Sequence, residues 1–62
     1  MYDEKKAFGI AVRQRLIELD MSQRELAKKI GSSENYIWHI THGRRAGTKY
    51  KKKIIDILKI TN

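Results

Sequence analysis

Hydrophobic residues recur every three or four positions in the first third of the chain, which is the spacing of an amphipathic helix. The pattern predicts a helix over about 3–19, with two acidic residues at its start, where the helix dipole favours negative charge. Gly9 is a poor helix residue and indicates either fraying or the close approach of another helix. Ile10 and Ile17 form a smaller apolar patch on the opposite side of the helical wheel. The expected core side consists of Phe8, Val12, Leu16 and Leu19.

A second helix is predicted to start sharply after Ser22. Ser22 and Glu25 have the spacing of a capping box, in which the hydroxyl accepts a backbone N–H and the carboxylate bonds back to the start of the helix. Gly31 is expected to end the helix, because glycine tolerates the left-handed conformation found there. The expected inner face consists of Leu26, Ala27 and Ile30.

Two more helices follow the same rules. Either Ser32 or Ser33 is expected to cap the third helix, and Gly43 to end it. Thr48 is predicted to cap a last helix over about 49–59. The two inner faces are expected to comprise Ile37, Ile40, Tyr50, Ile54, Ile57 and Leu58. Because the chain has no proline and only four glycines, the pattern predicts an all-α domain of four helices.

The most specific pattern is the pair of helices between about 22 and 42. Only two or three residues separate them, Ala27 is small enough for two helices to cross closely, and Gly31 provides the turn. This is the packing of a helix-turn-helix, in which two helices meet at roughly 90–120° across a short turn. Any corner between two helices of a small bundle fits the same pattern, so the spacing alone does not identify DNA as the partner.

Composition limits the classes of protein that remain. The chain has 62 residues and no cysteine, which excludes disulfides and cysteine-based zinc sites and fits a reducing cytoplasm. A chain this short buries only about 60% of its unfolded surface, so we expect a single domain over 1–62. No apolar run is long enough to span a membrane, and no nucleophile, base and orienting acid stand at recognisable spacing. We therefore expect no enzyme, no cofactor, no membrane partner and no small-molecule ligand.

Positive charge is concentrated in one segment. The formal net charge is +7, and six of the ten residues between 44 and 53 are basic while none is acidic. Clustered positive charge is typical of a nucleic-acid binder, and a solvated lysine face is the alternative. An anionic membrane surface is disfavoured, because the apolar face of the last helix is needed for the core. The lysines at 51–53 crowd the positive end of the last helix, which indicates that they meet phosphate. The basic residues are Arg44, Arg45, Lys49, Lys51, Lys52 and Lys53.

The outward side of the third helix carries groups that can recognise bases. Asparagine pairs with adenine through two hydrogen bonds, and glutamate accepts one from cytosine N4. Glu34 near the helix start also fits a dipole role alone, and the two histidines lack a third ligand for a metal. Trp38 is expected to contact a DNA sugar, a thymine methyl group or the C-terminal helix. The residues that share this arc, opposite Ile37 and Ile40, are Glu34, Asn35, Trp38, His39 and His42.

The segment SQRELAKKIG at 22–31, followed by SSENYIWHI at 32–40, resembles the lambda-repressor-like, Cro/CI-type (Xre) helix-turn-helix family of phage and bacterial regulators. The resemblance extends from about Phe8 to Ile60 and implies a compact domain of four to five helices that binds double-stranded DNA. It also implies a location in the bacterial cytoplasm, or in the host cytoplasm for a phage protein. Asp20 stands where the family often has glycine, so we expect the turn before the second helix to differ. The fifth helix, which often builds the dimer contact in this family, is absent or reduced.

The resemblance also implies how the site is divided. Gln23 meets phosphate together with the start of its helix, and Arg44 and the following loop lie along the DNA backbone. The residues predicted to read bases are Ser33, Glu34, Asn35, Trp38, His39 and His42. The residues predicted to contact phosphate are Gln23, Arg24, Tyr36, Arg44, Arg45, Lys49, Lys51 and Lys52.

The predicted function is therefore sequence-specific transcriptional regulation by a small phage-type or Cro-like repressor that reads the major groove with its third helix. A homodimer on a palindromic operator is part of this expectation. A DNA-binding accessory protein in excision or replication control, or an antitoxin, fits the same residues. A protein-interaction module on the same fold is the remaining alternative, with contacts from Ile10, Ile17, Trp38, Ile55 and Ile60.

Overall fold

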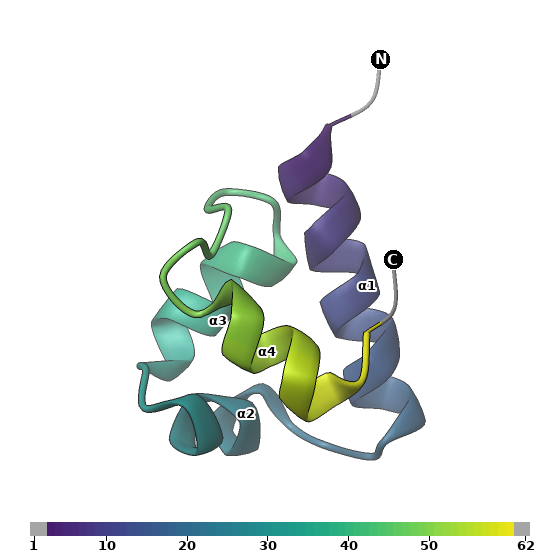
Figure 1. Ribbon diagram of the computed structural model, residues 1–62, viewed down its shortest axis with the longest axis vertical. Helices are drawn as coiled ribbons and strands as arrows, with labels where there is room; N and C mark the ends of the chain where they lie inside the picture. Colours follow the sequence, from purple (N-terminus) through teal and green to yellow (C-terminus); the bar gives the residue numbers. More distant parts are fainter. Residues whose placement is uncertain (1–2, 61–62) are drawn as a thin grey trace.

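The computed structural model describes residues 3–60, which form four helices and contain no strand. The helices are α1 (Glu4–Glu18), α2 (Gln23–Ile30), α3 (Glu34–Thr41) and α4 (Lys51–Leu58). In Figure 1, α1 stands along one side of the molecule, α3 and α4 lie against it, and α2 lies below them. The predicted all-α class and the order of four helices are confirmed.

One small hydrophobic core holds the four helices together. Its buried members are Val12, Leu16, Leu26, Ala27, Ile30, Ile37, Ile40, Ile54 and Leu58. Phe8, Tyr50 and Ile57 are half-buried against this core, as their places on the predicted inner faces suggest. Leu19 is 41% exposed, so its predicted core position is wrong. The reason is local, because α1 ends at Glu18 and Leu19 is the capping residue after it.

The predicted ends of the second and third helices agree with the structure. Ser22 and Glu25 form the capping box, with the Ser22 hydroxyl accepting the Glu25 N–H at 3.0 Å. Gly31 ends α2 with φ +77°, the left-handed conformation that glycine adopts without strain. Ser33 caps α3, because its hydroxyl accepts the N–H of Tyr36 at 3.1 Å.

The start of α4 differs from the prediction. Thr48 does not cap the helix; α4 begins at Lys51, its preceding residue is Tyr50, and no side chain caps it. Gly47 explains the shift, because a Cβ at this residue would lie only 2.9 Å from the Cδ1 of Ile40. Gly47 adopts φ +69°, and residues 47–51 form a turn in which the Tyr50 N–H donates to the Gly47 carbonyl at 3.0 Å.

Arg15 links the first helix to the last one. Its Nε donates to the Leu58 carbonyl at 2.6 Å, and its Nη1 forms an ion pair with Glu18 at the same distance. The Leu58 carbonyl belongs to the negative end of α4, where a cationic donor satisfies a group that the helix itself leaves unpaired. Arg15 therefore fixes the end of α4 against α1.

Replacement of Arg15 by alanine should lower the free energy of unfolding by about 2 kcal/mol, because a charged donor to a partly buried carbonyl is lost. The exposed ion pair with Glu18 contributes little to this figure. Urea unfolding followed by circular dichroism measures the change. Arg13→Ala on the same helix is the control, because the Arg13 side chain is exposed. Equal losses in the two variants would contradict the role of the Leu58 contact.

Candidate nucleic-acid interface

The helix-turn-helix is built from α2, α3 and the three residues between them. Ala27 is 4% exposed at the centre of the contact, and Ile37 and Ile40 of α3 are fully buried beneath it. Gly31 and the Ser33 cap set the change of direction between the helices. The residues predicted to form the corner therefore do so, and the opposite side of α3 is left facing outward.

Most of the predicted base-reading side chains are exposed on this outward side. Glu34, Asn35 and His42 are exposed, and Trp38 is 40% exposed. His39 is half-buried. An open depression of about 440 Å³ is lined by Gln23, Glu34, Asn35 and Trp38, so the first residue of α2 borders the reading side of α3.

Trp38 is surrounded by groups of its own helix and of the following loop. Its ring stacks on His42, with centroids 3.8 Å apart and planes at 20°, and His39 meets it edge-on at 5.2 Å. The Arg44 guanidinium lies 5.8 Å from the ring centroid. The aromatic contact with the start of α4 comes from Tyr36 instead, whose ring meets Tyr50 edge-on at 5.5 Å. The indole is thus held against its own helix, and Tyr36, not Trp38, makes the aromatic contact with the start of the C-terminal helix.

The His42 ring is fixed at its inner edge. Its Nδ1 lies 2.8 Å from the Trp38 carbonyl oxygen and 3.1 Å from the Thr41 hydroxyl oxygen. Because a carbonyl oxygen only accepts, we assign the Nδ1 proton to this contact in the neutral ring, which leaves Nε2 as an acceptor. The contact with the Trp38 carbonyl orients the His42 ring, and the ring in turn packs against one face of the indole.

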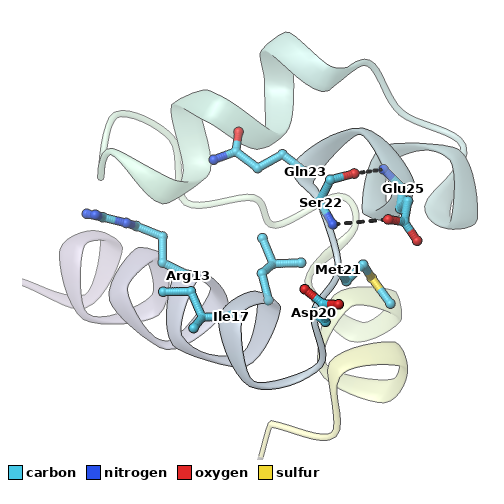
Figure 2. Close-up of a pocket in the computed structure, with 8 residues that line it drawn as sticks. Arg13, Ile17, Asp20, Met21, Ser22, Gln23 and Glu25 are labelled. Carbon is cyan, nitrogen blue, oxygen red and sulfur yellow. Dashed lines mark hydrogen bonds between the residues drawn. The ribbon is translucent and has the colours of Figure 1, made fainter.

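Gln23 ties the start of α2 to the end of α3. Its Nε2 donates to the Thr41 hydroxyl oxygen at 3.5 Å, and its side chain is half-buried. Gln23 also lines a second depression of about 620 Å³ between the end of α1 and the start of α2, shown in Figure 2. The capping box of Ser22 and Glu25 lies on one side of it, and the Arg13 side chain extends from α1 away from the capping box (Figure 2).

Arg13 is the residue at this edge that sequence reasoning missed. Helical spacing places it on the exposed side of α1 with Ile10 and Ile17, so its exposure was readable from the sequence. Its nearness to Gln23 depends on the turn that joins α1 to α2. Asp20 adopts φ +54° in that turn, so an aspartate takes the left-handed conformation that glycine tolerates best.

The basic segment divides into two groups of exposed side chains. Arg44 and Arg45 lie beside α3, the second with its guanidinium 5.7 Å from the ring centroid of Tyr36. The lysines lie around the start of α4: Lys49 and Lys53 lie near Tyr50, and the Lys51 ammonium lies 5.2 Å from the ring centroid of Phe8. Within residues 3–60 the one ion pair joins Arg15 to Glu18, so these basic residues have no carboxylate partner there.

The start of α4 adds to this positive potential. No side chain caps the helix, and its first turn consists of Lys51, Lys52 and Lys53. The unpaired N–H groups of a helix N-terminus carry partial positive charge, which the three ammonium groups reinforce. An anionic partner at this position would relieve the repulsion among them.

Residues 3–60 contain no group of three or more His, Cys, Asp or Glu side chains placed to hold a metal ion. None of the helices in that range is both long and apolar enough to cross a membrane.

A short corner of two helices, an exposed polar side on the second and a neighbouring basic segment together define a helix-turn-helix domain. A family model described as "Helix-turn-helix" matches residues 12–61. The chain belongs to this family, the Cro/CI-type, Xre-like helix-turn-helix proteins, and is by that membership a DNA-binding domain for double-stranded DNA. Searches of curated proteins and of solved structures return no match.

Proposed function

We propose that the protein is a sequence-specific transcriptional regulator that places α3 in the major groove, with a small Cro-like repressor of phage type as its class. The observation that carries the proposal is the placement of a polar reading side on α3 directly beside basic residues without carboxylate partners. Basic contacts to phosphate supply affinity and orientation, whereas contacts to base edges supply sequence preference.

The reading side has a distinct part for each residue. Asn35 is exposed and pairs with adenine through its amide, and Glu34 accepts a hydrogen bond from an amino group of adenine or cytosine. The Ser33 hydroxyl oxygen accepts the Tyr36 N–H, and its proton remains to be donated to a base or a phosphate. His39 and His42 border Trp38 and contact base edges next to it.

The backbone contacts surround this reading side. Gln23 brings the start of α2 to one phosphate group, and we add Arg13, which lines the same depression from α1. Arg44 and Arg45 flank α3, so they reach the strand beside the groove. The other residues proposed to contact phosphate are Arg24, Tyr36, Lys49, Lys51 and Lys52.

The regulatory role extends the proposal beyond DNA binding. We place the domain over residues 1–62 and expect a homodimer on a palindromic operator, whose half-sites lie about 34–36 Å apart. Ile10 and Ile17 support a self-contact, because they are 53% and 79% exposed on α1. A reporter fused to the protein's own promoter distinguishes repression, in which added protein lowers expression, from a role in excision, replication control or toxin neutralisation.

Selection from a random duplex pool at low and moderate salt tests the proposal. The proposed function predicts an enriched sequence at both salt concentrations, and the dimer predicts that the sequence is palindromic. Enrichment of a single half-site would contradict the homodimer but would remain consistent with a sequence-specific regulator. Absence of any enriched sequence, with retention of folded protein, would contradict sequence-specific binding and favour a protein-interaction module.

A further inference from the structure

We propose that Trp38 and Asn35 together form a site for an A·T base pair, in which Asn35 pairs with the adenine and the indole contacts a thymine methyl group. The thymine belongs to the same base pair or to its immediate neighbour. This inference rests on the proposed function and names the base pair that the depression of Gln23, Glu34, Asn35 and Trp38 accommodates.

The indole is prepared for such a contact before DNA arrives. His42 covers one face of the ring at 3.8 Å, and His39 lies against it edge-on. His42 is itself fixed by its 2.8 Å contact with the Trp38 carbonyl. A side chain that is 40% exposed yet supported in this way loses little conformational freedom on binding. Its uncovered part borders the depression and presents an apolar surface there.

The other groups around the depression define the chemistry of its occupant. Asn35 lies three residues before Trp38, so the two side chains are neighbours on the helix surface. Glu34 adds a carboxylate, which repels phosphate and accepts a hydrogen bond from an exocyclic amino group. An acceptor and one amino proton satisfy the Asn35 amide, and a methyl group satisfies the indole. Glu34 then accepts a hydrogen bond from the amino group of an adjacent base.

An A·T pair presents these groups in the major groove. Adenine shows N7 and the N6 amino group, and thymine shows O4 and the C5 methyl group. A G·C pair offers no methyl group for the indole. The DNA backbone fits poorly because Glu34 faces the depression, whereas Arg44 lies at the indole with positive charge suited to the nearby strand.

Uracil substitution tests the methyl contact directly, because uracil differs from thymine only by the absent methyl group. Each thymine of the selected duplex is replaced in turn, and binding is followed by the fluorescence of Trp38, the single tryptophan of the chain. One substitution per half-site should weaken binding about fourfold, as expected for one buried methyl group. The same substitution should have no effect on Trp38→Ala and should retain its effect on Trp38→Phe, with binding followed by fluorescence anisotropy of labelled duplex.

Circular dichroism confirms that each variant is folded. Equal binding of all uracil duplexes by the unaltered protein would overturn the inference, as would an undiminished uracil effect in Trp38→Ala. In both cases the preference for the selected over a scrambled duplex would persist, so the proposed function would stand. If the unaltered protein showed no preference for the selected over the scrambled duplex, both the proposed function and this inference would be contradicted.

Discussion

Replacing Gly9 by alanine should lower the free energy of unfolding by about 3 kcal/mol, although alanine is the better helix former. Gly9 is buried where α1 crosses α3. A Cβ there would press directly on the Ile40 carbonyl oxygen and lie 3.0 Å from the Thr41 carbonyl oxygen. Both obstacles are backbone atoms, so relief requires the helices to move apart. The close approach of two helices, and not fraying, therefore explains this glycine.

Urea unfolding measures the Gly9 effect, and Gln14→Ala provides the matched control on the exposed side of α1. The control should be neutral or slightly stabilising, because it changes helix propensity without touching another helix. A domain of this size has only a few kcal/mol of total stability, so Gly9→Ala should populate the unfolded state strongly. A Gly9→Ala protein as stable as the unaltered chain would show that α1 and α3 do not approach as described.

Raising the salt concentration from about 50 to about 200 mM should weaken duplex binding roughly a thousandfold. The reason is counterion release: six phosphate contacts give a slope of about −5 in a plot of log K against log salt concentration. Fluorescence anisotropy with a labelled duplex measures this slope. Six of the proposed contacts come from exposed basic side chains, namely Arg24, Arg44, Arg45, Lys49, Lys51 and Lys52.

Single substitutions assign the slope to the basic segment. Lys52→Gln should reduce its magnitude by about one unit, because one phosphate contact is lost. Lys59→Gln is the control, since Lys59 is exposed at the opposite end of α4. A slope near zero for the unaltered protein would contradict a phosphate-binding segment, and an equal change in the two variants would show that only net charge matters.

Local signals explain why most of the helix boundaries could be predicted from the sequence. The capping box of Ser22 and Glu25, the Ser33 cap and the turn at Gly31 depend on residues within a few positions of one another. The start of α4 could not be predicted in this way. Its position depends on the packing of Gly47 against Ile40, which is seven residues away and on another helix.

Contacts between distant segments account for the other differences. The hydrogen bond from Arg15 to the Leu58 carbonyl joins positions 43 residues apart, and nothing in the spacing of either residue indicates it. Helical periodicity placed Trp38 on the outward side of α3 correctly, but the stack on His42 depends on side-chain rotamers that periodicity does not specify. The position of Arg13 in the depression beside Gln23 likewise depends on the turn at Asp20.

The central claim is a division of labour, in which α3 reads bases and the basic segment holds the backbone. The most direct measurement is the ratio of affinities for the selected and a scrambled duplex, taken for the unaltered protein, Asn35→Ala and Lys52→Gln. The ratio should fall about tenfold or more in Asn35→Ala, because an amide that pairs with adenine is lost. It should stay unchanged in Lys52→Gln, while the affinity for both duplexes falls equally. An unchanged ratio in Asn35→Ala, or a ratio that falls alike in both variants, would contradict the claim.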